Sequence, residues 1–251
     1  MWGKMDQIIF CDIDGCLVEG QYAPFNMAGL AQVRHLCAQL AAKDIQLCLA
    51  TGRPKPYAEA MVQVLGLHTP YICESGAYVY HPKFAKPILR IKDRNKEKLA
   101  KLRTLLRAAN YTIEPGFEGK LRITWEGVSD MKEAEIAKHR EGLAAHYLAF
   151  GFKWSNSATA VDVLLKGYSK RNAALFLLER YGLKPENAYA IGDSESDRKM
   201  LEVVEVPMCP ANATPAIQAR CVTVAGAAGV LGVVELLNGV LGAVSEPETT
   251  A

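Results

Sequence analysis

The chain has 251 residues, of which half are apolar and 22% are charged, a composition typical of a globular protein with a real core and unlike that of a disordered chain. Lysine and arginine number 29 and aspartate and glutamate number 27, so the net charge is +2. This balance argues against a surface that binds polyanions in general and against a nucleic-acid partner. No apolar stretch reaches the length of a membrane span, and seven cysteines without a CxxC pair fit a reduced, cytoplasmic protein with no membrane partner.

The first eighty residues alternate short apolar runs with segments of helical periodicity. Buried parallel strands are predicted at 8–11, 45–50 and 71–73, and helices at 27–43 and 54–65.

From about Pro82 the alternation of short apolar runs with helical segments gives way to a mixed pattern. Strands are predicted at 88–91, 121–125, 152–154 and 160–165. Helices are predicted at 95–109 and, from the capping box of Asp130 and Glu133, at 130–149.

The parallel rhythm returns near Lys170. Helices are predicted at 172–181, 195–203 and 215–219, strands at 188–191, 206–209 and 222–224, and a closing helix before a frayed tail at 245–251. The pattern predicts an open α/β sheet interrupted by an α+β insert. In such sheets ligands bind beyond the carboxyl ends of the strands, so the polar clusters that follow the strands should converge.

The first cluster is the pair of carboxylates Asp12 and Asp14, which follow a buried strand. Burying them is costly unless a cation or a bound phosphate offsets their charge. Asp12 can attack phosphorus as a nucleophile, and Asp14 is placed to protonate the leaving oxygen and later to activate water.

Two further clusters can hold a phosphate. Thr51 and Gly52, in Thr51-Gly52-Arg53, offer a hydroxyl and backbone N–H groups at a helix start. Lys170 precedes a helix and can neutralise both Asp12 and an incoming phosphate.

The last cluster contains Asp193 and Asp197 after a strand. Mg²⁺ prefers oxygen ligands, which Asp12, Asp193 and the backbone carbonyl of Asp14 can provide.

Each cluster alone has a structural alternative. Asp12 and Asp14 fit an ordinary turn, Thr51 fits a helix cap, Lys170 fits a solvated lysine, and Asp193 fits a helix cap. Four such clusters in this order favour an active site.

The ordered motifs Asp12-x-Asp14, Thr51-Gly52, Lys170 and Gly192-Asp193-x-x-x-Asp197 resemble those of the haloacid dehalogenase-like phosphatases. The resemblance implies a Rossmann-like core at 1–81 and 167–251 and an inserted α/β cap domain at 82–166, as in the sugar-phosphatase branch. Ser75, Arg171 and Ser196 stand where that branch more often has Asn, Gly and Asn.

Within the branch, the segment from Cys209 to Thr214 is similar to that of archaeal-type phosphoglycolate phosphatases, as is the compact insert with Arg122 and Trp125 on one predicted strand. The resemblance implies that Asp12 is nucleophile and metal ligand and Asp14 is acid and base. It also implies that Thr51, Gly52 and Lys170 bind phosphate, that Asp193 binds Mg²⁺, and that Asp197 is a ligand or its support. The candidates for reading the substrate are Arg53, Lys120, Arg122, Trp154 and Asn212.

The expected activity is Mg²⁺-dependent hydrolysis of a small phosphorylated metabolite, phosphoglycolate or a sugar phosphate. A sugar phosphomutase and a non-catalytic phosphate-binding module are the alternatives. The sequence does not distinguish a monomer from a homodimer.

Overall fold

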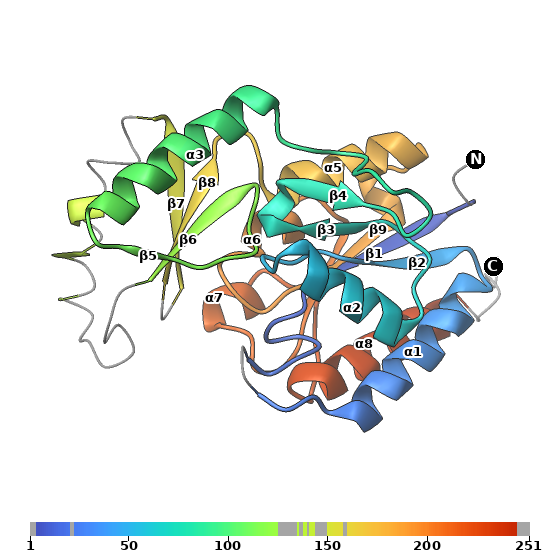
Figure 1. Cartoon of the computed structure of the whole chain (residues 1–251). Coiled ribbons are helices and arrows are strands. Elements are labelled where there is room, and N and C mark those ends of the chain that lie inside the picture. Colours follow the sequence, from blue (N-terminus) through green and yellow to red (C-terminus); the bar gives the residue numbers. More distant parts are fainter. Residues whose placement is uncertain are drawn as a thin grey trace.

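The computed structural model describes residues 4–20, 23–124, 135, 138–139, 141–143, 150–157 and 160–244, with the backbone alone at 154–157. Two sheets lie in two lobes, as Figure 1 shows: one holds the chain ends and most helices, and the other holds β5 to β8 beneath α3. No helix of the described part is both long and apolar enough to cross a membrane.

The larger lobe contains a parallel sheet in the order β11-β10-β9-β1-β2. Its strands are β1 (Gln7–Cys11), β2 (Ile45–Leu49), β9 (Ala188–Ile191), β10 (Val206–Cys209) and β11 (Thr223–Val224). β1 is apolar on both faces because helices cover both sides of the sheet.

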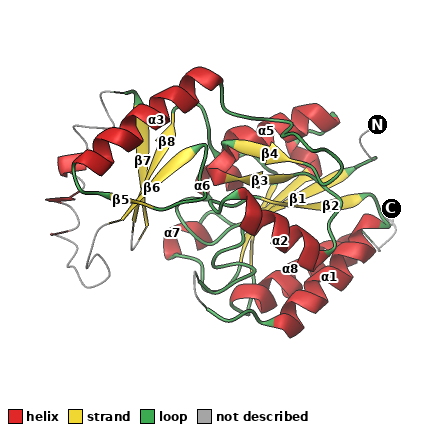
Figure 2. Cartoon of the chain, in the orientation of Figure 1, coloured by secondary structure: helices red, strands yellow, loops and turns green. Residues whose placement is uncertain are grey.

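Alternate residues of β1 enter two separate cores. Ile9 and Cys11 pack with α1, α2 and α8, whereas Ile8 and Phe10 pack with α5, α6 and α7. These helices are α1 (Met27–Ala41), α2 (Lys55–Leu65), α5 (Lys170–Tyr181), α6 (Arg198–Leu201), α7 (Pro215–Gln218) and α8 (Gly229–Ala243). The open parallel α/β sheet expected from the sequence is confirmed, and helices cover both of its faces (Figure 2).

An antiparallel hairpin extends the sheet beyond β2. It consists of β3 (Tyr71–Cys73) and β4 (Tyr78–Tyr80), joined by the short helix η1 (Glu74–Gly76). A single parallel bridge between Ala50 and Ile72 connects β3 to the end of β2.

The smaller lobe, which we call the cap, is a four-stranded antiparallel sheet in the order β5-β6-β8-β7, with α3 over it (Figure 2). Its elements are α3 (Asp93–Ala108), β5 (Thr112–Ile113), β6 (Lys120–Thr124), β7 (Phe152–Ser157) and β8 (Ala160–Leu165). Strand residues alternate between the two faces, so the buried apolar side chains pack with α3 and their neighbours face the parallel sheet's lobe. The division of the chain at 81/82 and 166/167 stays a prediction.

Two predicted elements are corrected by the structure. The strand expected at 88–91 is wrong, because only Leu89 pairs, with Val79, and Pro87 before it offers no N–H to prolong the pairing. The helix expected at 195–203 is limited to α6, because the Asp197 carboxylate binds the backbone N–H groups of Asp193 and Ser194 and holds this segment as a turn.

Some predictions fall on residues outside the described part. These are Trp125, most of the helix expected at 130–149 and the tail at 245–251, whereas 135, 138–139 and 141–143 are helical. β5 was not predicted from the sequence.

Candidate active site

The four sequence clusters converge at the carboxyl ends of the parallel strands, under the cap. Asp12, Asp14, Lys170 and Asp193 line one cavity of about 780 Å³ together with Gly52. The cap contributes the opposite wall from β6, β7 and β8, so the cavity is a cleft between the two lobes. Polar residues at strand ends therefore form a single site, as the fold predicts.

Asp12 lies at the floor of this cleft, directly after β1. Its Oδ1 accepts hydrogen bonds from the N–H of Ile13, at 2.7 Å, and from Nζ of Lys170, at 2.9 Å. Asp12 is only 4% exposed, and Oδ2 accepts no hydrogen bond from any residue of the described part. Asp12 therefore presents one oriented oxygen with its lone pairs free for a ligand or an electrophile.

Lys170 is buried between two carboxylates. Its Nζ lies 2.9 Å from Asp12 Oδ1 and 2.6 Å from Asp197 Oδ1. Burial alone would lower the pKa of Lys170, but the charges of Asp12 and Asp197 outweigh it and raise the pKa above its usual value. Lys170 is a fixed cation at the point where a phosphate would approach Asp12.

Three carboxylates, from Asp12, Asp193 and Asp197, bring oxygens within 4.8 Å of one another. With Lys170 as the neighbouring cation, they leave an excess of negative charge in a buried place. Burial and then the charge of Asp197 raise the pKa of Asp12 well above its usual range, and the same two causes raise the pKa of Asp193 to about 6. An all-oxygen donor set with uncompensated charge fits a divalent cation such as Mg²⁺.

The two members of this cluster after β9 differ in their hydrogen bonding. Both oxygens of Asp197 are engaged: Oδ1 by Lys170 and Oδ2 by the N–H groups of Asp193 and Ser194 and the Ser194 hydroxyl. Asp193 lines the cleft, and its carboxylate packs on Gly15, where an added Cβ would lie 2.1 Å from Oδ2. The geometry favours Asp193 as the ligand and Asp197 as the residue that holds the loop and Lys170.

Asp14 is paired with Arg53 across the cleft. Arg53 Nη2 lies 2.6 Å from Oδ1 of Asp14, and Arg53 Nε lies 2.9 Å from Oδ2, an interaction through two guanidinium nitrogens. The guanidinium also stacks over the Tyr57 ring at 4.6 Å, which fixes its plane. Arg53 therefore orients the Asp14 carboxylate.

The segment after β2 supplies the side of the cleft. Gly52 and Arg53 line it, whereas Thr51 is fully buried behind them and its Oγ1 accepts a hydrogen bond from the Arg53 N–H at 3.0 Å. Ser75 lies close by, with Oγ 3.4 Å from the position of a Gly52 Cβ. Ser75 adopts a left-handed conformation with φ of 57°.

The cap presents a charged wall opposite Asp12. Lys120 Nζ lies 2.8 Å from Asp162 Oδ2, and Arg122 Nε lies 2.7 Å from Glu114 Oε2, while all four residues line the cleft. Lys120 is almost fully buried, and its Nζ would lie 3.7 Å from a Cβ on Gly52. Burial lowers the pKa of Lys120, and Asp162 opposes this effect.

A buried carboxylate also joins the two lobes. Oε2 of Glu74 accepts hydrogen bonds from the backbone N–H groups of Glu118, at 3.0 Å, and of Gly119, at 2.6 Å. Burial raises the pKa of Glu74, and the two N–H groups act in the opposite direction. Glu74 therefore connects the hairpin of β3 and β4, which lies beside Gly52, to the loop that leads into β6.

Asn212 lies apart from the cleft lining. Its Nδ2 donates to the Gly15 carbonyl at 2.9 Å, and its Oδ1 accepts from the Gly229 N–H at 2.7 Å. Asn212 thus connects the Asp12–Gly15 turn to the start of α8. The side chain of Trp154 lies outside the described part.

The sequence analysis missed Glu74, Glu114, Lys153 and Asp162. Three of them lie in the cap, where Lys153 and Asp162 could be signalled by the alternation along β7 and β8, while Glu114 follows the short strand β5. Glu74 was assigned no role, because its partners are backbone groups 44 and 45 residues away.

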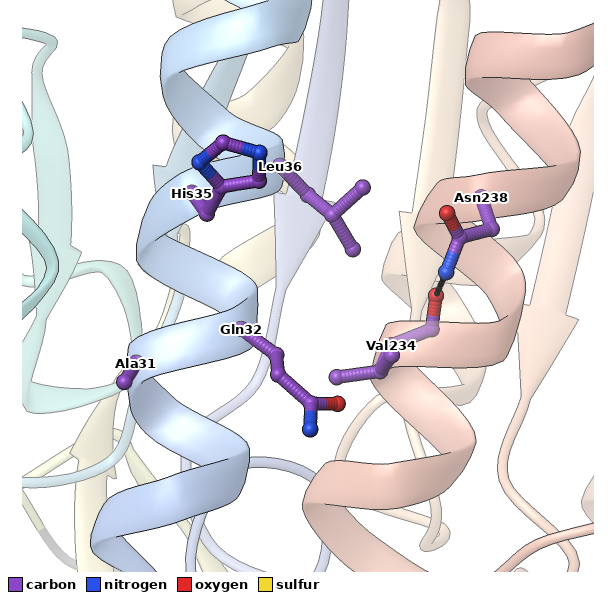
Figure 3. Close-up of a pocket in the computed structure, with 6 residues that line it drawn as sticks. All are labelled: Ala31, Gln32, His35, Leu36, Val234 and Asn238. Atoms are coloured by element: carbon purple, nitrogen blue, oxygen red, sulfur yellow. Dashed lines mark hydrogen bonds between the residues drawn. The ribbon is translucent and has the colours of Figure 1, made fainter.

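A second, smaller hollow lies between α1 and α8 (Figure 3). It is lined by Ala31, Gln32, His35, Leu36, Val234 and Asn238, and the Asn238 amide donates to the Val234 carbonyl at 2.9 Å. It shares no lining residue with the cleft and contains no carboxylate, so it carries none of the chemistry of the candidate site.

Comparison with known proteins places these features in a family. A family model described as haloacid dehalogenase-like hydrolase matches residues 9–114 and 126–237. A phosphoglycolate phosphatase of Archaeoglobus fulgidus is 29% identical over 92% of this chain and 95% of its own length. A glucosyl-3-phosphoglycerate/mannosyl-3-phosphoglycerate phosphatase of Persephonella marina is 26% identical over 80% of this chain and 83% of its own length.

Solved structures share the fold at lower identity. A protein of Thermoplasma acidophilum superposes with a TM-score of 0.73 at 19% identity, covering 94% of this chain and 98% of that one. A haloacid dehalogenase-like hydrolase of Bacteroides thetaiotaomicron superposes with a TM-score of 0.75 at 15% identity, covering 93% of this chain and 99% of that one. The two-lobed fold is therefore common to these proteins.

Proposed function

Because the chain belongs to the haloacid dehalogenase-like hydrolase family, we propose that it is a Mg²⁺-dependent phosphatase that hydrolyses a small phosphate monoester through an aspartyl-phosphate on Asp12. The observation that carries this proposal is the arrangement of Asp12. Its Oδ2 is free of hydrogen bonds from the described residues, while Oδ1 is held by Lys170 at 2.9 Å. An oriented, buried carboxylate beside a fixed ammonium suits attack on phosphorus.

We assign the metal to Asp12, Asp193 and the backbone carbonyl of Asp14, with Asp197 as the residue that supports the loop. When bound, Mg²⁺ neutralises charge on the phosphate and on the carboxylates. The excess negative charge of Asp12, Asp193 and Asp197 supports this assignment.

In the first step, Asp12 Oδ2 forms a bond to phosphorus and the bond from phosphorus to the leaving oxygen breaks. Asp14 gives its proton to that oxygen, so the alcohol leaves neutral. Lys170 and the Gly52 N–H bind the phosphate oxygens, and the Thr51 hydroxyl supports this segment from behind.

In the second step, water attacks the phosphorus of the aspartyl-phosphate while Asp14 takes one of its protons. The bond between phosphorus and Asp12 breaks, which releases inorganic phosphate and restores the carboxylate. Arg53 keeps Asp14 oriented through both steps.

We propose a small phosphorylated carboxylic acid, with phosphoglycolate first, as the substrate. The names of the relatives from Archaeoglobus fulgidus and Persephonella marina support this choice. On the cap wall, Lys120 and Arg122 are paired with acidic residues, but Lys153 also lines the cleft and is compatible with an anionic leaving group.

Replacement of Asp12 by Asn tests the mechanism. The variant keeps the size of the side chain but removes the nucleophilic oxygen, so phosphate release from phosphoglycolate and from p-nitrophenyl phosphate should fall to background while circular dichroism stays unchanged. EDTA should abolish wild-type activity, and added Mg²⁺ should restore it.

Full activity of Asp12→Asn, or of the EDTA-treated protein, would contradict the mechanism. Formation of an isomerised sugar phosphate in place of free phosphate would identify a mutase. Tight binding of phosphate and Mg²⁺ without turnover by the wild type would identify a binding module.

A further inference from the structure

The polar face of the cap sheet is organised in rows that cross its strands. Strand register places Lys120, Leu164 and Lys153 in one row, from β6 through β8 to β7. It places Arg122 opposite Asp162 in the next row. Because side chains at alternate strand positions share a face, all five lie on the face that lines the cleft.

Two of the three cations on this face are neutralised within the cap. Lys120 pairs with Asp162 at 2.8 Å, and Arg122 pairs with Glu114 at 2.7 Å and lies 4.0 Å from Asp162. These four charges therefore balance one another and need no ligand to do so.

Lys153 differs from both. Its ammonium group forms no ion pair or hydrogen bond with any residue that the structure describes, although the residue is partly buried. Leu164 separates it from Lys120 in the row, and Asp162 is already engaged by Lys120.

The charge that faces Lys153 comes from the other lobe, and it has the same sign. Lys199, on α6, also lines the cleft and repels Lys153, and burial together with this repulsion lowers the pKa of Lys153. Lys199 forms no ion pair in the described part either, because the nearby Glu195 and Glu202 are bound by Arg198. Lys199 is exposed, so water screens part of this repulsion, but both ammonium groups line one cleft, and an anion held between them would be stabilised by both charges.

We propose that Lys153 of the cap and Lys199 of the core together bind a second anionic group of the substrate, a carboxylate or a second phosphate on the leaving group. This proposal rests on the proposed function, since it places the reacting phosphate at Asp12. It makes Lys153 and Lys199 specificity-determining residues, and it makes one ligand group bridge the two lobes.

The test measures binding rather than turnover, with the Asp12→Asn variant in the presence of Mg²⁺ and isothermal titration calorimetry. Phosphoglycolate is compared with ethyl phosphate, and 3-phosphoglycerate with glycerol 3-phosphate, since each pair differs in the carboxylate. Ethanediol bisphosphate provides the second phosphate.

We expect at least one carboxylate-bearing ligand to bind about tenfold or more tightly than its partner without the carboxylate, or the bisphosphate to exceed ethyl phosphate by as much, the usual size for a hydrogen bond to a charged group. Lys153→Met, which keeps the apolar stem, should remove most of this advantage. Lys101→Met, on the exposed face of α3, should not change it. Whether the carboxylate or the second phosphate gains from Lys153 identifies the group.

A double variant provides an independent check. If one anion contacts both ammonium groups, Lys153→Met and Lys199→Met should be non-additive, with the double variant losing less than the two single losses combined. The proposal is overturned if Lys153→Met weakens the binding of ligands with and without the second anionic group equally, or weakens neither. Absence of turnover in the wild type would reject the phosphatase mechanism but would leave this binding result to be judged by itself.

Discussion

At the scale of single residues, the acid and base functions of Asp14 can be distinguished by the choice of leaving group. Its carboxylate is gripped by Nη2 and Nε of Arg53, so replacing it by Asn should keep the side chain in place but remove its acid and base functions. For an alkyl phosphate, loss of a general acid should slow the first step by about 10² to 10⁴-fold.

With p-nitrophenyl phosphate the Asp14→Asn variant should behave differently. Nitrophenolate leaves without a proton, so a rapid burst of one nitrophenolate per site should precede slow turnover, since the water attack still lacks its base. Stopped-flow absorbance measures both phases, with the exposed Asp93→Asn as the control. Equal steady-state rates for Asp14→Asn and the wild type on both esters would contradict the assignment.

Asp193 links metal binding to stability. Burial and the charge of Asp197 raise its folded pKa to about 6, above the usual value of 3.8. A raised pKa means that the folded state prefers the protonated form, so this contribution to stability is complete below about pH 3.8 and is lost as the pH rises through 6.

Asp193→Asn should therefore stabilise the metal-free protein at pH 8 by about 1–2 kcal/mol, after allowance for solvent screening, and the gain should vanish near pH 4. Urea unfolding in EDTA gives the free energy of unfolding of each protein at each pH. The difference between variant and wild type removes the effect of the other titrating groups. Saturating Mg²⁺ at pH 8 should stabilise only the wild type. A gain for Asp193→Asn that is independent of pH would contradict the argument.

At the scale of elements, the turn η1 positions the start of α5. Gly76 has φ of +90°, and an added Cβ would lie 2.1 Å from the backbone oxygen of Ser169, the residue before Lys170. Gly182, after α5, also has a positive φ, of +67°, but nothing lies within 4 Å of its added Cβ.

The two glycines are thus matched for backbone conformation and differ in contact. Gly182→Ala should cost about 1 kcal/mol, and Gly76→Ala should cost a further 1–3 kcal/mol from the clash. Because the clash displaces the backbone next to Lys170, only Gly76→Ala should also lower kcat. Urea unfolding and phosphate release measure the two effects, and equal losses for both variants would show that the contact is unimportant.

Local patterns were sufficient to predict the strands of the parallel sheet and the clusters at their ends. β1 and β9 are short apolar runs that end at Asp12 and before Asp193, and the carboxyl-end rule brings such residues together whatever the details of packing. The length of α6 was not predictable in this way. Its start depends on how the Asp197 side chain competes for backbone N–H groups.

The cap was less readable for a related reason. The face on which Lys153 and Asp162 lie depends on the register of β7, β8 and β6, which bring together segments about forty residues apart. The hydrogen bonds of Glu74 to the Glu118 and Gly119 N–H groups depend on how closely the two lobes approach, which local sequence patterns do not predict.

At the scale of the whole molecule, the two lobes divide the work of the cleft. The lobe of the parallel sheet supplies Asp12, Asp14, Lys170 and Asp193, and the cap supplies the wall opposite them. Glu74 joins the lobes, and Lys153 of the cap and Lys199 of the core both line the cleft. The reaction and the choice of leaving group thus depend on different parts of the chain.

The alternation along the cap strands has a consequence for how such an enzyme can acquire new substrates. Leu121, Val163 and Phe152 pack in the core shared with α3, whereas Lys153 and Leu164, the neighbours of Phe152 and Val163, line the cleft. Substitutions at those neighbouring positions can change preference while the hydrophobic packing and the nucleophile stay intact. Natural selection, or a laboratory library confined to positions 153 and 164, can therefore explore new specificities one codon at a time without breaking the buried ion pair of Lys120 and Asp162.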